Sequence, residues 1–451
     1  MTKGSERQYI LKILEDIQTK QAFMNKVIDD YFFVYDFDKQ QRSFIARVVY
    51  GTIEHQNYIN FCINNVSNIK INKMKPTIRS ILRMSVYQIL FMDKVPAHAA
   101  INEAVKLTQK RKFTNLKSFV NGVLRNIERQ KQEFPELIKK LPEADFLSVR
   151  YSLNHELTTY LLTQYSFEAL ERFLVESQRE KETCVRTNVL KLTTAELKEK
   201  LISLCEIREG NLFDDSFYIR GYDQLQLLEP FLKGEFQVQD ESSTIVGIIA
   251  NLERESKVID VCAAPGGKTT HMAMLMENAG NVIACDISEA KTQKIYENCK
   301  RLNLSNVSIV TQDATIKNED FINAFDTVVA DVPCSGLGVL RSKPDIKHNM
   351  TREKITRLIE IQKSILQNVK DYVKVGGVLI YSTCTINKDE NANQMDEFLR
   401  CNPSFIAIDL MQEPQLNSLI KNHIKDNYLQ LLTDEQVTDG FFIAKLKRIQ
   451  E

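Results

Sequence analysis

The sequence predicts a multi-domain protein with an all-α N-terminal domain (1–140), a small α+β module (145–235) and a C-terminal α/β domain with a Rossmann-like sheet (236–451). Three observations support this fold class. The chain has 451 residues, which is more than one hydrophobic core usually serves. Glycine is scarce and apolar residues follow helical spacing before residue 140. After residue 236, apolar strand-like runs alternate with helix-like segments, as in a parallel sheet with crossover helices.

The N-terminal region is predicted to be helical from the spacing of its apolar residues. Pro76 and Pro96 mark two helix starts, and one amphipathic stripe follows the first of them. The residues of this stripe are Ile81, Leu82, Val86, Ile89 and Leu90.

A basic stretch follows between residues 106 and 131, where eight basic residues stand against one acidic residue, Glu128. They are Lys106, Lys110, Arg111, Lys112, Lys117, Arg125, Arg129 and Lys131. The stretch is either an ordinary solvated helix face or a surface for a phosphate backbone, where each neutralised phosphate adds salt-sensitive affinity.

Two N-terminal segments resemble a known family. Residues 79–105 (RSILRMSVYQILFMDKVPAHAAINEAV) and 118–127 (SFVNGVLRNI) are similar to the NusB-type helical RNA-binding domain, and the resemblance spans about residues 5–130. It implies a helical bundle that contacts RNA.

The remaining elements are predicted in chain order. In the α+β module, 184–190 and 217–221 are expected strands and 194–201 an expected helix. In the C-terminal domain the expected parallel strands are 257–261, 281–286, 307–311, 327–331 and 378–382, and 439–446 is an expected closing antiparallel strand.

Composition excludes several protein classes. Hydrophobic residues make up 43% of the chain and charged residues 26%, with a net charge of +0, so any nucleic-acid surface must be local. No apolar run approaches the roughly 20 residues of a membrane span, and the first residues lack a signal-peptide core. Nine cysteines without a C-x-x-C pair argue against a disulfide framework and a zinc ribbon. We expect a cytoplasmic protein with reduced thiols, no metal and no membrane contact.

A glycine-rich loop follows the first C-terminal strand. The residues CAAPGGKT (262–269) lead into an apolar helix, and Gly266 and Gly267 allow close approach of a ligand to the backbone. The pattern approaches the P-loop G-x-x-x-x-G-K-[ST], but Cys262 replaces its first glycine. A nucleotidase with Asp331 as its Mg²⁺ partner therefore stays open on the loop alone.

Two carboxylates favour an adenosine ligand without a triphosphate. Asp286 ends the next strand, about 20 residues beyond the glycines, where a carboxylate commonly holds ribose hydroxyls. Asp313 follows the third strand, in a position to reach an adenine. Either could instead cap a helix. S-adenosylmethionine is the candidate that fits both carboxylates.

Two cysteines follow strand-like runs, Cys334 in DVPCSG and Cys384 in YSTCT. Chemistry in open α/β sheets lies at the carboxyl ends of strands, so one thiol is a candidate nucleophile and the other its helper. A thiolate that adds to carbon 6 of cytosine turns carbon 5 into a nucleophile for a methyl group. Asp331 is placed to face the N3 and amino edge of such a base. Cys262, Cys285 and Cys299 are expected to pack in the interior.

These motifs are similar to those of the RNA cytosine-C5 methyltransferases of the Sun/Fmu and NOL1/NOP2 family, over about residues 236–450. The motifs are CAAPGGKT, DVPCSG, RSKPDIK and YSTCT, in that order. The resemblance implies that Cys384 is the nucleophile and that Cys334 assists product release. It also implies an S-adenosylmethionine site formed by Cys262, Ala263, Ala264, Pro265, Gly266, Gly267, Lys268, Asp286, Asp313 and Asp331. With the N-terminal domain, it points to the bacterial enzymes that methylate one cytosine of 16S ribosomal RNA.

Two residues depart from the family pattern. Val332 stands where the family often has Ala, and His348 stands where the subfamily commonly has Trp, which leaves base stacking there open. Lys268, Arg341 and Lys343 could contact phosphate or the cofactor carboxylate. Arg341 and Lys343 could equally be solvated loop charges.

The sequence therefore leads to one expected function and two alternatives. We expect an S-adenosylmethionine-dependent RNA methyltransferase that is monomeric and acts on 16S ribosomal RNA, either free or in an early assembly intermediate. The alternatives are a P-loop-like RNA-dependent nucleotidase and a non-catalytic RNA-binding factor. The last would leave both strand-end thiols unexplained.

Overall fold

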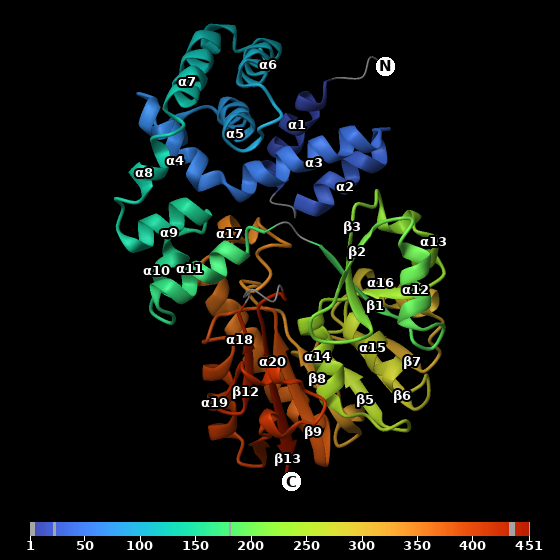
Figure 1. Ribbon diagram of the computed structural model, residues 1–451. Coiled ribbons are helices and arrows are strands. Elements are labelled where there is room, and N and C mark those ends of the chain that lie inside the picture. Colours follow the sequence, from blue (N-terminus) through green and yellow to red (C-terminus); the bar gives the residue numbers. More distant parts are fainter. Residues whose placement is uncertain (1–4, 21–23, 180–181, 433–437, 451) are drawn as a thin grey trace. The chain divides into compact units, whose positions relative to one another are not determined.

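The computed structural model describes residues 5–20, 24–179, 182–432 and 438–450, which fall into two compact units. The helical unit comprises the chain up to Gln178 together with Ser342–Thr351, and the sheet unit comprises Arg179–Arg341 together with the chain from Arg352 onward. Figure 1 shows the helices of the first up to residue 178 in blue and green, its helix near residue 346 in orange, and the strands of the second from green to red. The predicted division at residues 140, 145 and 235 stays a prediction; of the predicted α+β module, residues 145–178 group with the helical unit and residues 179–235 with the sheet unit.

The helical unit confirms the predicted all-α N-terminal region, and its helices continue beyond residue 140. They are α1 (Glu6–Lys20), α2 (Met24–Val34), α3 (Lys39–Glu54), α4 (Gln56–Val66), α5 (Pro76–Phe91), α6 (Ala97–Lys110), α7 (Lys117–Gln130), α8 (Phe134–Ile138), α9 (Glu143–Tyr151), α10 (His155–Leu161), α11 (Phe167–Glu176) and the distant short helix α17 (Ile346–Asn349). Pro76 occupies the first turn of α5, where its missing N–H costs nothing.

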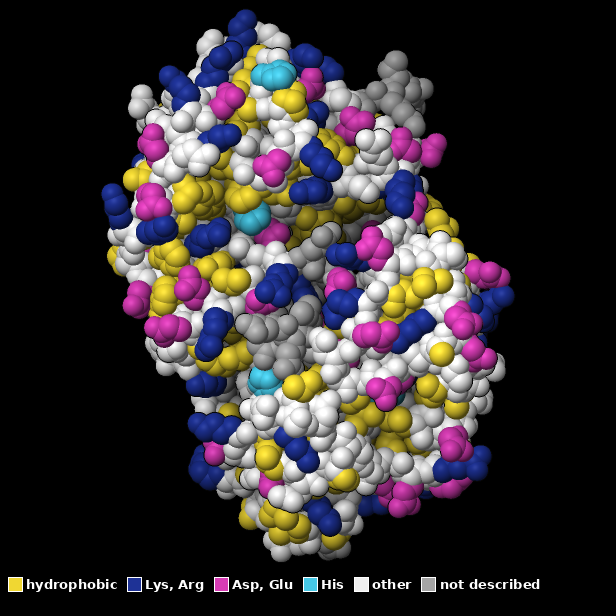
Figure 2. Space-filling view, viewed as in Figure 1, with side chains coloured by type: hydrophobic (Ala, Val, Ile, Leu, Met, Phe, Trp, Pro, Cys, Tyr) yellow, Lys and Arg dark blue, Asp and Glu magenta, His cyan; other side chains and the backbone are white. Residues whose placement is uncertain are grey.

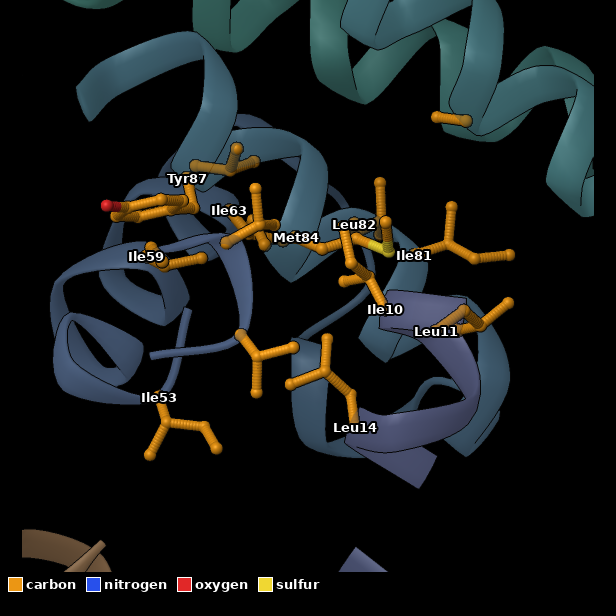
Figure 3. Packing of buried hydrophobic residues seen from close by; sticks show 14 of the residues in the cluster. Ile10, Leu11, Leu14, Ile53, Ile59, Ile63, Ile81, Leu82, Met84 and Tyr87 are labelled. Carbon is orange, nitrogen blue, oxygen red and sulfur yellow. The ribbon is translucent and has the colours of Figure 1, made fainter. Parts of the chain in front are cut away.

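Helix α5 lies at the centre of this unit and packs against α1, α3, α4, α6 and α7. Figure 3 shows its apolar side chains meeting those of α1 and α4. The labelled residues of this core are Ile10, Leu11, Leu14, Ile53, Ile59, Ile63, Ile81, Leu82, Met84 and Tyr87, all of them buried. Burial of this apolar stripe, rather than helix propensity, stabilises the bundle.

The sheet unit begins with a four-stranded antiparallel sheet in the order β2-β3-β1-β4. Its elements are β1 (Thr183–Thr187), α12 (Thr194–Leu201), β2 (Glu206–Glu209), β3 (Ser216–Arg220), α13 (Glu229–Leu232) and β4 (Phe236–Val238). The predicted strand 184–190 runs past the observed end of β1. The Asn188 side chain donates to the carbonyls of Gly234 and Leu302, and the chain turns there.

The larger sheet has the order β11-β12-β13-β9-β8-β5-β6-β7, with β10 paired to β13. Its strands are β5 (Lys257–Asp260), β6 (Asn281–Asp286), β7 (Val307–Thr311), β8 (Phe325–Asp331), β9 (Val373–Thr383), β10 (Phe405–Ala407), β11 (Ile424–Lys425), β12 (Tyr428–Leu431) and β13 (Phe441–Arg448). The run from β7 to β9 is parallel, and β13 closes it antiparallel. This confirms the predicted α/β fold and places the carboxyl ends of the parallel strands along one edge.

Helices cover both faces of this sheet. They are α14 (Glu241–Ala250), α15 (Gly267–Leu275) and α16 (Glu289–Leu302) in one apolar core, and α18 (Arg352–Val369) and α19 (Ala392–Cys401) in the other. The short helix α20 (Ser418–Lys421) precedes β11. Neighbouring residues of a strand face opposite cores, as Val258 and Ile259 of β5 do. Over the described ranges, no helix has both the length and the apolar character of a membrane span.

Candidate active site

The glycine-rich loop connects the end of β5 to the start of α15 at the carboxyl edge of the sheet. Gly266 has φ +104°, in the left-handed region, and a Cβ there would lie 3.3 Å from the Ile295 side chain. Its N–H donates to the Ala263 carbonyl at 2.7 Å, and the Ala264–Pro265 peptide bond is cis. The loop therefore requires glycine at this position and brings the backbone close to the N-terminus of α15.

Asp286, at the end of β6, holds this loop in place. Its carboxylate accepts hydrogen bonds from the backbone N–H of Ala264 at 2.9 Å and of Ile287 at 2.8 Å. Lys291 on α16 forms an ion pair with it at 2.9 Å, and the Asp286 side chain is only 4% exposed. The structure thus brings Asp286 to the predicted loop, where it carries backbone contacts as well as charge.

Asp313 follows β7 and forms a local turn. Its carboxylate accepts from the backbone N–H of Thr315 at 2.9 Å and from the Thr315 hydroxyl at 2.7 Å. The turn fixes the loop after β7 without starting an α-helix, so the helix-cap interpretation does not describe this residue.

Lys268 and Asp331 form an ion pair at the centre of the site. The Lys268 ammonium lies 2.7 Å from one carboxylate oxygen of Asp331, and the Ser382 hydroxyl donates to the other at 2.7 Å. The two side chains are 12% and 28% exposed. In a P-loop enzyme this lysine would face phosphates and this aspartate a metal ion. Their direct pairing satisfies both charges and speaks against the nucleotidase alternative.

Sequence reasoning missed Asp260, the last residue of β5. Its carboxyl is fully buried and accepts a hydrogen bond from the Thr269 hydroxyl at 2.7 Å. Burial first, and the neighbouring charge of Asp331 to a smaller degree, raise its pKa to about 7, although the hydrogen bond from Thr269 acts in the opposite direction. Asp260 ends an otherwise apolar strand directly before the loop, and this position was the available signal.

Carboxylates gather around the loop, and their charge decides which ligand fits. The pKa of the Cys262 thiol is raised well above its usual value by burial and then by Asp260, Asp286 and Asp331. Lys268 and Lys291 are already paired with Asp331 and Asp286, so these two lysines offer little positive charge to a triphosphate, whereas the carboxylates are compatible with a positively charged sulfonium. Together with the left-handed glycine, they fit S-adenosylmethionine.

The two strand-end cysteines lie side by side. Cys334 follows β8 and Cys384 follows β9, and their sulfurs are 3.3 Å apart. The hydrogen bond to Cys384, followed by burial, raises the pKa of Cys334 well above its usual value. Asp331 ends the same strand, three residues before Cys334. Because β8 and β9 are parallel neighbours, adjacent strand ends bring together residues fifty positions apart.

The other cysteines named from the sequence pack in the interior. Cys285 is 1% exposed and Cys299 5% exposed, and Cys262 is partly buried against one of the sheet cores. Burial raises the pKa of Cys285 to about 12 and that of Cys299 to about 11, so both stay as thiols. A thiol is a poor nucleophile compared with a thiolate.

The residues that depart from the family pattern or carry loop charges lie in different settings. Val332 is buried in the core around β8. Arg341 is not a solvated charge, because its side chain is 4% exposed and its guanidinium lies 3.7 Å from Asp439. Lys343 is exposed and belongs to the helical unit. In the same unit, the His348 Nε2 atom lies 2.7 Å from the Ile53 carbonyl oxygen.

Sequence reasoning also missed a buried polar network next to the two cysteines. Glu390, in the turn after β9, is fully buried and accepts hydrogen bonds from Asn387 in the same turn and from Ser335 in the loop after β8. The Gly338 N–H donates to the Cys384 carbonyl at 3.0 Å, and a Cβ on Gly338 would lie 2.0 Å from the Gly440 carbonyl oxygen. Glycine at 338 and glutamate at 390 therefore have structural reasons that no local motif discloses.

Comparisons with known proteins agree with this geometry. Residues 247–447 match the family model of the 16S rRNA methyltransferase RsmB/F, and residues 5–129 match that of the NusB family, so both resemblances are confirmed. The Bacillus subtilis (strain 168) protein named "Probable ribosomal RNA small subunit methyltransferase B" is 34% identical over 99% of this chain and 100% of its own length. A Proteus mirabilis protein named "Ribosomal RNA small subunit methyltransferase B" is 28% identical over 91% of each chain.

Solved structures show the same fold. PH0851 superposes with a TM-score of 0.81 at 23% identity, covering 99% of this chain and 100% of its own. NSun6 from Pyrococcus horikoshii, solved with SFG, superposes with a TM-score of 0.57 at 22% identity, covering 66% of this chain and 98% of its own. The match to the Bacillus subtilis protein over almost the whole chain, together with the family model over residues 247–447, places the chain in the family of ribosomal RNA small subunit methyltransferases B. These enzymes are S-adenosylmethionine-dependent.

Proposed function

We propose that this protein methylates carbon 5 of one cytosine in 16S ribosomal RNA through a transient covalent bond between Cys384 and carbon 6 of the base. The observation that carries the proposal is the pair of sulfurs 3.3 Å apart at the ends of two parallel strands. S-adenosylmethionine supplies an electrophilic methyl group. Carbon 5 of cytosine is too weak a nucleophile to take this methyl group without prior addition of a thiolate to carbon 6.

Each proposed role follows from what the residue contacts. Cys384 attacks carbon 6 as the thiolate, and the electron pair released to carbon 5 takes up the methyl group. Asp331, held by Lys268 at 2.7 Å and by Ser382 at 2.7 Å, orients the N3 and amino edge of the base and distinguishes cytosine from uracil. The cofactor site is formed by residues 262–268 with Asp286, Asp313 and Asp331.

Release requires that the carbon 5 proton leaves, that the 5,6 double bond re-forms and that the carbon 6–sulfur bond breaks. We assign the assisting role to Cys334. Its pKa is raised first by the hydrogen bond to Cys384 and then by burial. Once the Cys384 sulfur is bonded to carbon 6, this hydrogen bond and the accompanying charge are lost. The pKa of Cys334 then falls, so that it can lose its proton to solvent and be present as the thiolate that takes up the carbon 5 proton.

The RNA surface is proposed to lie on the helical unit. Seven of the eight basic residues between positions 106 and 131 are exposed, while Arg111 is ion-paired with Glu15 and half-buried. Figure 2 shows Lys and Arg side chains gathered at the top of the view, over the end of this unit that carries α6 and α7. The target base must be accessible, because a stacked base cannot receive a thiol.

The experiment compares two variants with labelled cofactor and 16S ribosomal RNA. Cys334→Ala should form the bond to carbon 6 but release it slowly, so a covalent protein–RNA species should accumulate on denaturing gels. Cys384→Ala should transfer no methyl group and form no such species. Adducts with the cysteines reversed would overturn the assignment, and methylation at another atom would overturn the proposal.

A further inference from the structure

A buried carboxylate lies behind the two cysteine loops. Glu390 follows β9 by seven residues and is 0% exposed, although it is the only charged group of its immediate network among the described residues. One carboxylate oxygen accepts from the Ser335 N–H at 2.8 Å and from the Gln362 amide at 3.1 Å. The other accepts from the Ser335 hydroxyl at 2.5 Å and from the Asn387 amide at 2.9 Å. Of these donors, Ser335 directly follows Cys334, Asn387 lies three residues after Cys384, and Gln362 lies on α18.

The network reaches both cysteines through their chain neighbours. Ser335 follows Cys334 directly, and Pro333 precedes it with a carbonyl that accepts from Gln362 at 2.9 Å. Thr385 follows Cys384, and its hydroxyl lies 2.8 Å from that of Ser335. The residues on both sides of Cys334 and the residue after Cys384 are thus bonded to one another through Glu390 and its partners.

Burial makes this carboxylate costly to keep. It raises the pKa of Glu390, while the hydrogen bonds from Ser335, Asn387 and Gln362 act in the opposite direction. An apolar side chain of similar size would avoid the cost of desolvation. Packing alone therefore does not explain a charged group at this position. The loops that this network joins carry the two thiols, which indicates a role in placing them.

We propose that Glu390 is a positioning residue that holds the Pro333–Ser335 turn against the Cys384 loop, so that the Cys334 thiol stays beside the nucleophile during product release. The inference rests on the proposed function, because it assigns Glu390 to the release step of that reaction. In that step the carbon 5 proton passes to the Cys334 thiolate, its electron pair forms the 5,6 double bond, and the carbon 6–sulfur bond breaks to return the Cys384 thiolate. A misplaced Cys334 slows this step and leaves the earlier attack by Cys384 intact.

The test is Glu390→Gln in the full-length protein, with 16S ribosomal RNA and labelled S-adenosylmethionine. Each oxygen of Glu390 accepts from at least one N–H group, so either orientation of the glutamine amide sets its NH₂ against a donor. We expect kcat to fall by about 10- to 100-fold, because a displacement of about 1 Å can cost roughly 100-fold. The single-turnover rate of methyl transfer and the KM for the cofactor should stay within about twofold of wild type. Covalent adduct should accumulate as in Cys334→Ala.

Glu397→Gln is the matched control. Glu397 lies on α19, is 47% exposed and pairs with Lys363 at the surface. This variant should behave as wild type and form no adduct beyond the wild-type level. A double variant, Glu390→Gln with Cys334→Ala, should accumulate no more adduct than Cys334→Ala alone if Glu390 acts through Cys334.

Ser335→Ala decides the matter if Glu390→Gln does not fold. It removes the hydroxyl bonds to Glu390 and Thr385 and keeps the backbone bond, so we expect the same pattern with a kcat loss of about 3- to 10-fold, from partial displacement of the turn. Adduct at the wild-type level in both folded variants, or a loss of methyl transfer without adduct, would overturn the inference. If wild type itself transfers no methyl group to cytosine, or Cys334→Ala forms no adduct, the proposed function fails instead.

Discussion

The two units of this protein illustrate the two directions in which burial shifts a pKa. In the helical unit, burial lowers the pKa of His55 to about 3 and that of His348 to about 4. At the strand ends of the sheet unit the buried groups are acids, and burial raises the pKa of Asp260 to about 7. Burial favours the neutral form in both places. The same physical cause therefore lowers the pKa of these two bases and raises that of an acid beside the glycine-rich loop.

The largest effect on methyl transfer is expected when a charge is removed at the strand ends of the sheet unit. Asp331→Asn keeps the shape of the side chain but leaves Lys268 without its carboxylate partner. We expect methyl transfer to fall by about 100- to 10,000-fold, the range of general acid–base and orienting groups, with little change in thermal stability. Asp326→Asn, on the same strand and paired with Lys374 near the surface, is the control and should stay within about twofold. An equal loss of methyl transfer in both variants would contradict a specific role for Asp331 and indicate a general effect of acidic residues on β8.

The pH dependence of the sheet unit tests Asp260. The pKa of Asp260 is about 7 when folded and ordinarily 3.8, so between these values the folded state binds more protons than the unfolded state. Stability should fall as pH rises from about 4 to about 7, by roughly 4 kcal/mol, since each pKa unit corresponds to about 1.4 kcal/mol. Denaturant unfolding of Asp260→Asn, which can still accept from Thr269, should lack this fall. A variant with the same pH profile as wild type would contradict the assignment.

The helical unit should show the opposite sign. His348 has a pKa of about 4 when folded against an ordinary value of 6.5, so the unfolded state binds more protons between these values. Its contribution is present above pH 6.5 and is lost as pH falls toward 4, by roughly 3 kcal/mol. His348→Gln keeps a donor for the Ile53 carbonyl and should remove this loss from the unfolding transition of the helical unit. An unchanged acid dependence would assign it to other groups.

Apolar packing should not distinguish the units. Ile59 of α4 and Ile259 of β5 are each 0% exposed. Ile→Val at either position should cost about 0.5–1.5 kcal/mol in the free energy of unfolding, because one buried methylene is lost. The cost should appear in the transition of the unit that carries the variant, since multi-domain proteins often unfold in more than one step. Phe33→Ala, at a residue 92% exposed, is the control and should change stability by less than about 0.5 kcal/mol.

Much of the fold and of the site was predictable, for local reasons. The alternation of apolar strands with helices indicated the parallel sheet, and sheet topology alone requires that Asp286, Asp331 and Cys384 lie at the same edge. The positions of the two cysteine motifs after predicted parallel strands therefore indicated a common site from the sequence alone. The burial of the Arg341 guanidinium was harder to predict, because its partner Asp439 lies nearly a hundred residues away in the sequence.

By itself the sequence determined the order of elements, the glycine that the loop requires and the identity of the chemical groups at the strand ends. These follow from backbone preferences and from periodicity, both of which act over a few residues. Only the tertiary structure decided the 3.3 Å approach of the two sulfurs, the pairing of Lys268 with Asp331 and the enclosure of Glu390. Burial and hydrogen-bond distance are properties of groups brought together from distant parts of the chain, and these properties set the pKa values and positions on which the proposed reaction depends.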